Sequence, residues 1–164
     1  MENRMDQKDT RYQSFCKAID ILDDGVALIN AYDALLHDYD GEKMYQAESQ
    51  MIKAIGSHQG ITAAQLAESF GKTASACSQL IRKLKNKGWV QQQRNPVNSR
   101  EYNLFLSQEG KKFFEKHRKF EEACYQRTFK MLGDVSEADL QTYIRIQQCL
   151  NRAFALDVEE SRML

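Results

Sequence analysis

The sequence predicts a mainly α-helical chain with a small β component, an α+β fold. Three observations lead there. Apolar residues recur every three or four positions over long stretches, only one proline occurs in 164 residues, and one short segment around that proline alternates apolar and polar side chains. An apolar content of 42% is enough for a hydrophobic core, and the length suits one domain with helical extensions.

Two helices are predicted before residue 60. Spacings of three and four between apolar residues predict a long amphipathic helix from about 8 to 38, with Asp23-Asp24-Gly25 as a place where it bends. A second helix is predicted over 44–56, with Gly56 as its end and with a buried side formed by Met44, Ala47, Met51, Ile52 and Ile55.

Two short helices follow in close succession. Thr62 is a good N-cap, and Gln65 three residues later completes a capping box. Gly71 ends this helix, Thr73 caps the next one, and that helix runs to about Lys87. Two short helices joined by a glycine-containing turn form a helix-turn-helix, whose second helix enters the major groove of DNA.

The next elements are a β-hairpin and two long helices. Strands are predicted over 89–94 and 101–106, and their connecting loop contains Pro96. Helices are predicted over 108–132 and from an N-cap at Ser136 onward. These helices and the first one are too long and too apolar on one side for a small winged domain to cover, so we expect them to pair with a second copy of the chain.

The predicted organisation therefore has three parts: an N-terminal dimerisation helix in 1–40, a winged helix-turn-helix domain in 41–107, and C-terminal dimerisation helices in 108–164. The fold class is a winged helix-turn-helix with long terminal dimerisation helices.

Charge is concentrated in one segment of a chain that is neutral as a whole. Residues 69–100 contain seven bases and no acid, whereas residues 1–50 contain eleven acids and five bases. Such a segment repels itself, which favours an external polyanion as its partner over a merely solvated face. The bases are Lys72, Arg82, Lys83, Lys85, Lys87, Arg94 and Arg100.

The outward face of the second helix suits base edges. Its small residues allow close approach, Gln79 can form a bidentate pair with adenine, and Arg82 and Lys83 suit phosphate or guanine. The hairpin loop ending in Arg100 suits a minor-groove or backbone contact. The predicted DNA-binding residues are Lys72, Thr73, Ser75, Ala76, Ser78, Gln79, Arg82, Lys83, Arg94, Asn98 and Arg100.

This arrangement resembles the MarR family of bacterial transcription regulators. The stretch "ITAAQLAESFGKTASACSQLIRKLKNKGWV" is followed by a wing and by "LFLSQEGKKFFEKH". The family pattern matches at Leu66-Ala67, at Leu84 with Lys87-Gly88, and at the Leu106–Gly110 junction after the wing.

The resemblance implies a homodimer that binds a near-palindromic operator in double-stranded DNA, mostly as a repressor released by a small ligand or an oxidant. The wing departs from the family pattern in one respect. The family commonly has Asp-x-Arg, whereas this chain has Asn98-Ser99-Arg100. An amide can accept a hydrogen bond but cannot form an ion pair, so we expect Arg100 to be held less firmly.

A small aromatic or lipidic effector is expected to meet residues near the helix junctions: Phe15, Cys16, Tyr39, Tyr45 and Met51. An alternative is a thiol-based redox sensor using Cys16, assisted by Tyr32 and Tyr39, because some relatives sense hydroperoxides with a cysteine in this place. Plain core positions are the more common role of such residues. Three scattered histidines with no matching cysteines argue against a metal site, and no cofactor is expected.

Other functions are less compatible with the sequence. It has no glycine-rich phosphate loop, no Ser-His-Asp order on a plausible scaffold and no metal-hydrolase signature, so an enzyme is not expected. A winged-helix protein-interaction module without DNA binding remains an alternative. The polar N-terminal run is not followed by an apolar segment, so neither a signal peptide nor a membrane span is expected, and the predicted location is cytoplasmic.

Overall fold

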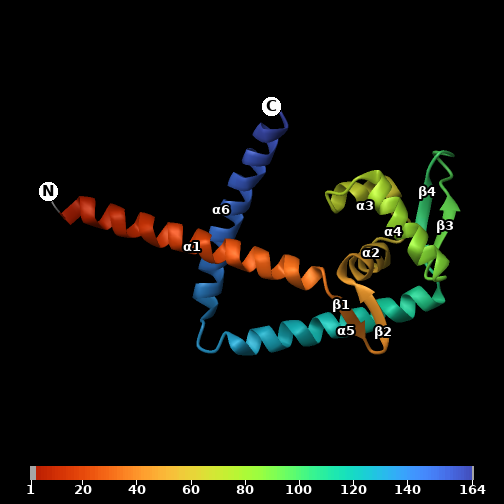
Figure 1. Ribbon diagram of the computed structural model, residues 1–164, viewed down its shortest axis with the longest axis horizontal. Helices are drawn as coiled ribbons and strands as arrows, with labels where there is room; N and C mark the ends of the chain where they lie inside the picture. The colour runs from red at the N-terminus through yellow and green to blue at the C-terminus, as the bar shows by residue number, and fades with distance from the viewer. Residues whose placement is uncertain (1–2, 164) are drawn as a thin grey trace. The chain divides into compact units, whose positions relative to one another are not determined.

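The computed structural model describes the backbone of residues 3–163 and the side chains of residues 9–163; the start of the polar N-terminal run lies outside these residues. It consists of two compact units, one ending at Glu121 and one beginning at Glu122. The elements, labelled in Figure 1, are α1 (Asn3–Asp33), β1 (Leu36–Tyr39), β2 (Glu42–Tyr45), α2 (Gln46–Ser57), α3 (Ala63–Ser69), α4 (Ala74–Asn86), β3 (Val90–Arg94), β4 (Tyr102–Leu106), α5 (Gln108–Met131) and α6 (Glu137–Arg162).

The hydrophobic core of the first unit gathers around α2. Met51, Ile52 and Ile55 of α2 are fully buried, and the apolar stripes of α3, α4 and the β3–β4 hairpin pack with them. The stripe of α4 consists of Cys77, Ile81 and Leu84, at the spacing that places three side chains on one side of a helix. The mainly α winged helix-turn-helix fold is confirmed, and the predicted bounds of α3, α4 and the hairpin are right to within about two residues.

The region between α1 and α2 differs from the prediction. The first helix ends at Asp33 rather than 38 and is not interrupted at Gly25, and residues 36–45 form an antiparallel hairpin. Asp40 and Gly41 make its turn with φ of 57° and 89°, the left-handed pair that two-residue hairpins require. The predicted helix start at Met44 is therefore wrong, because Met44 lies in β2 and is buried from there.

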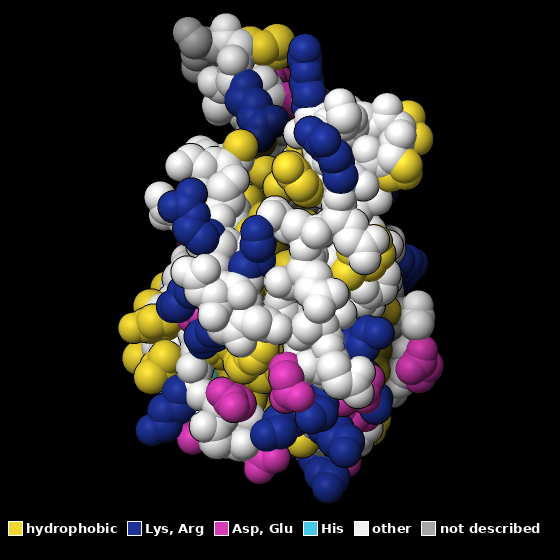
Figure 2. Space-filling view, turned by 90° about the vertical axis from the view of Figure 1, so that its right-hand side faces the viewer, with side chains coloured by type: hydrophobic (Ala, Val, Ile, Leu, Met, Phe, Trp, Pro, Cys, Tyr) yellow, Lys and Arg dark blue, Asp and Glu magenta, His cyan; other side chains and the backbone are white. Residues whose placement is uncertain are grey.

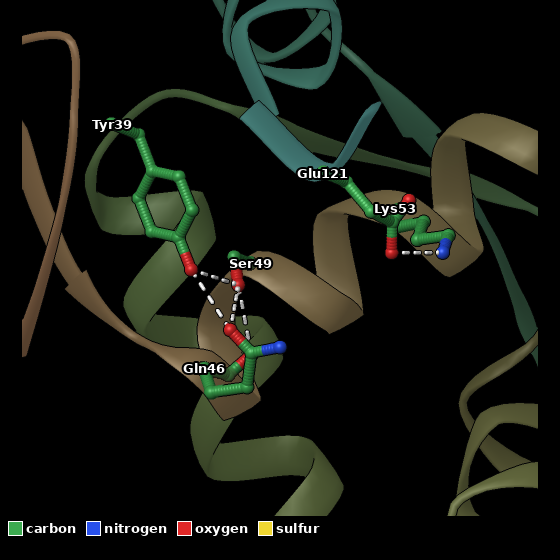
Figure 3. Close-up of polar contacts among 5 residues, drawn as sticks. All are labelled: Tyr39, Gln46, Ser49, Lys53 and Glu121. Carbon is green, nitrogen blue, oxygen red and sulfur yellow. Dashed lines mark hydrogen bonds and ion pairs between the residues drawn. The ribbon is translucent and has the colours of Figure 1, made fainter. Parts of the chain in front are cut away.

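A buried polar network fastens this hairpin to α2 (Figure 3). The hydroxyl of Tyr39 donates to Gln46 Oε1 at 2.9 Å and lies 3.0 Å from Ser49 Oγ. The Ser49 hydroxyl also lies 2.9 Å from the backbone oxygen of Gln46, which it reaches as a donor. Because a buried hydroxyl without a partner is costly, this network fixes the position of β1 on α2.

Helix α5 completes the core of the first unit. Its Phe113 stacks on Trp89 at 4.9 Å between ring centroids, and Phe113, His117 and Phe120 surround the Tyr39 ring. Burial lowers the pKa of His117, and the nearby Glu121 carboxylate opposes that change. On the surface, Lys53 and Glu121 form an ion pair of 2.6 Å between α2 and α5, also drawn in Figure 3.

The second unit contains the end of α5 and α6. Ser136 and Asp139 form the capping box of α6 that the sequence predicts, and hydrogen bonds from Ser136 lower the pKa of Asp139. Helix α6 has no buried residue along its described length, and Tyr143, Ile144 and Phe154 are among its exposed apolar side chains. This unit therefore carries an amphipathic helix whose apolar side is left largely exposed by the described residues.

Gly110, in the first turn of α5, lies very close to the backbone of Trp89 at the base of the wing, and a substitution there tests whether this approach matters for stability. A Cβ at this position would overlap the carbonyl oxygen of Trp89, which is backbone and cannot rotate away. We predict that Gly110→Ala lowers the free energy of unfolding by about 1–3 kcal/mol, the usual cost of overpacking. Urea denaturation measures this effect, with the exposed Lys111→Ala of the same turn as control, expected to stay within about 0.5 kcal/mol of wild type. Equal stabilities for the two variants would show that the close approach is not constraining.

Candidate nucleic-acid interface

The helix-turn-helix is set by two caps and one glycine. The Thr62 hydroxyl oxygen accepts from Gln65 N–H at 3.3 Å, while the Thr62 N–H donates to Gln65 Oε1 at 2.9 Å. Gly71 has a φ of 57°, and the Thr73 hydroxyl oxygen accepts from Ala76 N–H at 3.2 Å to start α4. Both predicted caps are confirmed, and α4 presents its N-terminal turns to the outside.

The outer face of α4 carries the residues predicted to meet bases. Ser75, Ser78, Gln79 and Arg82 are exposed, and Ala76 is half-buried at the edge of this face. The position four residues after Arg82 is Asn86, which is also exposed and lies on the same side of the helix. Sequence reasoning missed Asn86, although its spacing from Gln79 and Arg82 was the available signal.

The two lysines on the flank of α4 behave differently. Lys83 Nζ lies 3.1 Å from Glu48 Oε2, and Lys87 Nζ lies 3.7 Å from Glu48 Oε1. Glu48 belongs to α2, so it does not appear in the acid-free segment of the sequence. Lys83, predicted as a phosphate or guanine contact, therefore already has a carboxylate partner.

The other cations of the segment divide into two groups. Lys85 donates to Gln92 Oε1, and Arg94 Nε donates to the carbonyl oxygen of Ser99 at 3.2 Å. Lys72, Arg82 and Arg100 have exposed side chains that form no ion pair within the described residues. These three cations are the ones most available to an anionic ligand.

The wing consists of β3, β4 and the loop between them. The side-chain oxygen of Asn95 accepts from the N–H groups of Val97 and Asn98 at 2.9 and 3.0 Å, which folds the loop back on itself. At the tip of the loop, the Val97 side chain is 95% exposed. Asn98 Oδ1 accepts from the backbone N–H of Arg100 at 3.1 Å, so it positions the backbone of Arg100 and leaves the guanidinium without a brace from Asn98.

The wing is anchored to the helix-turn-helix by backbone hydrogen bonds. Leu104 N–H donates to Ile61 O at 2.9 Å, and Gly60 N–H donates to Leu104 O at 2.8 Å. The wing and α4 therefore belong to one structural unit. Figure 2 looks onto the molecule from this side and shows Lys and Arg side chains across the face, with the acidic side chains gathered in its lower part.

The predicted effector residues lie in three different settings. Tyr39 and Met51 are core residues with 1% exposure, and the Tyr39 hydroxyl is hydrogen-bonded to α2. Tyr45 is exposed, with Lys83 Nζ 5.8 Å from its ring centroid. Phe15 is exposed and Cys16 is half-buried, both on α1.

The remaining chemistry-bearing groups offer neither a reactive thiol at Cys77 nor a metal site among the described residues. Cys77 is fully buried on the inner face of α4, and burial raises the pKa of its thiol, while the charge of Lys72 opposes that change. Across the part of the chain that is described, no three His, Cys, Asp or Glu side chains come close enough to hold a metal ion. No helix there combines the length and apolar character needed to cross a membrane.

Comparison with known proteins agrees with this geometry. Residues 46–101 match the model of the MarR family. The fold is similar to that of Streptococcus pneumoniae FabT in complex with DNA, with a TM-score of 0.65 and 19% identity over 90% of this chain and 99% of that one. No curated protein sequence matches the chain significantly.

Two further solved structures show the same likeness. The MarR protein from Peptoclostridium difficile has a TM-score of 0.65 and 17% identity over 87% of this chain and 88% of that one. The S. aureus MepR–DNA complex has a TM-score of 0.58 and 20% identity over 67% of this chain and 80% of that one.

The fold and the exposed face of α4 thus define a winged helix-turn-helix protein. The resemblance predicted from the sequence is confirmed for residues 46–101, which match the MarR family model, and the fold of the chain is that of solved MarR-family structures.

Proposed function

We propose that this protein is a DNA-binding transcription regulator, a ligand-responsive repressor that binds a near-palindromic operator as a homodimer in the cytoplasm. The observation that carries the proposal is an exposed, small and amide-bearing face on α4, together with Lys72, Arg82 and Arg100, exposed cations that form no ion pair within the described residues. Two proteins of similar fold, FabT and MepR, were solved in complex with DNA.

The proposed contacts divide by role. The outer face of α4 enters the major groove, where Gln79 reads a base edge and Arg82 reaches phosphate or guanine. Arg100 on the wing contacts the backbone or the minor groove. The other predicted contacts support these positions: Lys72, Thr73, Ser75, Ala76, Ser78, Arg94 and Asn98. Lys83 is distinct because Glu48 already neutralises it.

The homodimer follows from the apolar side chains that the described chain leaves uncovered. On α1, Leu28 is 72% and Ile21 62% exposed, and on α6 Tyr143 is 60% exposed. Stable soluble chains rarely leave so many large apolar side chains in water. A second copy of the same helices is the simplest cover, and it would present two copies of α4 to a two-fold symmetric site.

We further propose that a small aromatic or lipidic effector releases the protein from DNA. This part of the proposal rests on the family resemblance. Of the residues predicted for this effector, Phe15 and Tyr45 can be reached without opening the core. Tyr39 and Met51 could contact an effector only after the core around them rearranges, because both are almost fully buried.

Binding to duplex DNA should depend steeply on salt. A dimer that neutralises six to ten phosphates loses about 10³ to 10⁵ in affinity between 50 and 200 mM salt, because bound counterions are released. Fluorescence anisotropy with a random-sequence 30-base-pair duplex measures the slope. A nearly flat dependence would exclude the phosphate contacts and favour the protein-interaction alternative.

Substitutions of Arg100 and of Gln79 should change DNA binding in different ways. Arg100→Ala should weaken binding to all duplexes to a similar extent, because it contacts the backbone or the groove shape. Gln79→Ala should change the preference at one base position by about 1–3 kcal/mol. Selection from a random duplex pool, with sequencing for each variant, measures both effects. A uniform loss for Gln79→Ala would reduce its role to positioning.

Dimer formation should depend on the apolar side of α6. Sedimentation equilibrium should give about twice the chain mass of 19.0 kDa for the wild type. Ile144→Asp should raise the dimer Kd at least about tenfold, because it would bury an unpaired charge. Thr142→Asp, at an exposed polar position on the opposite side of the same helix, serves as the control. A monomeric wild type would contradict the homodimer directly.

A further inference from the structure

Glu48 is the one fully buried carboxylate among the described residues, and it lies beneath the flank of α4. Its side chain is 3% exposed, and it sits at the third position of α2. Its two cationic partners are Lys83 of α4 and Lys87, the C-cap of that helix, which lie one helical turn apart and both reach α2. Glu48 of α2 thus compensates the positive charge of two of the lysines beside the proposed interface.

The contacts of Glu48 are incomplete without both lysines. Oε2 accepts from Tyr45 N–H at 3.3 Å and lies 3.1 Å from Lys83 Nζ. Oε1 has no hydrogen-bond donor, and its nearest cation is Lys87 Nζ at 3.7 Å. A buried carboxylate needs compensating charge, so Glu48 draws both ammonium groups towards α2.

Aromatic rings also contact the same two ammonium groups. Lys83 Nζ lies 5.8 Å from the centroid of Tyr45, and Lys87 Nζ lies 5.0 Å from that of Trp89. Each lysine therefore has both a carboxylate and an aromatic ring as partners. Arg82, the immediate neighbour of Lys83, has neither kind of partner among the residues described.

A DNA phosphate would have to compete with this carboxylate. Two unit charges at a given distance attract about four times more strongly at an effective dielectric constant of 20, typical near protein, than in water. A phosphate of the solvated duplex approaches each lysine from the water side, whereas Glu48 approaches from the protein side. The internal partner has the advantage, provided that it stays ionised and in place.

We infer that Glu48 is a specificity-determining residue that acts as an internal substitute for phosphate. It keeps Lys83 and Lys87 out of the backbone contacts, while Ser75, Gln79 and Arg82 remain free to read DNA. Non-specific affinity comes almost entirely from phosphate neutralisation, whereas specific affinity also includes base contacts. Base contacts fix the register of α4 in the operator complex, whereas a non-specific complex can shift until these lysines meet phosphates. Withholding two cations per subunit therefore lowers non-specific binding more than operator binding, and raises the preference for the operator. This inference rests on the proposed DNA-binding function.

A purely structural role for Glu48, in docking α4 on α2, makes a different prediction. Loss of docking would lower stability and weaken binding to every duplex without adding phosphate contacts. Release of the two lysines would instead steepen the salt dependence. The salt slope therefore separates the two roles.

The first experiment compares Glu48→Gln with the wild-type protein on a random-sequence 30-base-pair duplex. Glutamine keeps the shape and can still accept from Tyr45 N–H. The expected slope of log affinity against log salt is steeper by about 0.9 for each lysine released, which is about a 3.5-fold larger loss per lysine between 50 and 200 mM. At 50 mM the variant should bind this duplex more tightly than the wild type does.

The preference for specific DNA should fall in the same variant. The specific probe is a duplex that the wild-type protein selects from a random pool, and the ratio of its affinity to that of the random duplex should decrease at least threefold. Glu115→Gln is the matched control, because it removes one acid from an exposed ion pair with Arg118 and changes net charge equally. Its slope should equal that of the wild type.

A second comparison uses the neighbouring cations. In the wild-type background, Lys83→Gln should reduce the salt slope less than Arg82→Gln does, because Lys83 is held by Glu48. In the Glu48→Gln background the two substitutions should reduce it equally. If Glu48→Gln does not fold, as judged by circular dichroism, the wild-type comparison decides: equal reductions for Lys83→Gln and Arg82→Gln overturn the inference.

Different results would overturn the DNA-binding function and the role of Glu48. A shallow salt slope for the wild type overturns the DNA-binding function itself. A steep wild-type slope that Glu48→Gln leaves unchanged overturns the role of Glu48 and leaves DNA binding intact.

Discussion

The rotation of α4 about its own axis determines the rest of the interface. Cys77, Ile81 and Leu84 form a stripe that is almost completely buried, so the helix can pack on the core in only one orientation. That orientation turns Ser75, Gln79 and Arg82 outward and turns Lys83 and Lys87 towards α2. A rotation by one residue would bury a lysine and expose a leucine. The division between outward-facing and withheld cations is therefore a consequence of core packing.

Local signals made most of the fold predictable from the sequence. The caps at Thr62, Thr73 and Ser136 each use a side chain and a backbone N–H within three residues, and all three were found where the sequence places them. The β1–β2 hairpin was missed because the apolar spacing of α1 continues through Leu36. The Asp40-Gly41 pair was the contrary signal, since it favours a two-residue turn.

The site could be predicted only in part, for a physical reason. The outward face of α4 follows from helical periodicity, but the partner of Lys83 comes from another helix, and no local pattern reports such a pairing. Residues 69–100 contain seven bases and no acid, yet in space Glu48 compensates two of these bases. Self-repulsion within that segment is smaller than its composition indicates. The role of Asn98, by contrast, is local: its side chain accepts from the backbone N–H of Arg100 two residues later and does not contact the guanidinium.

The close approach of Gly110 to Trp89 has a mechanical consequence. Trp89 leads directly into β3, and Gly110 lies in the first turn of α5, an unbroken helix that ends at Met131. Backbone touches backbone at this point, with no flexible side chain between them to absorb a displacement. A tilt of α5 would therefore displace Trp89, and with it the start of β3 at the base of the wing, by a similar amount.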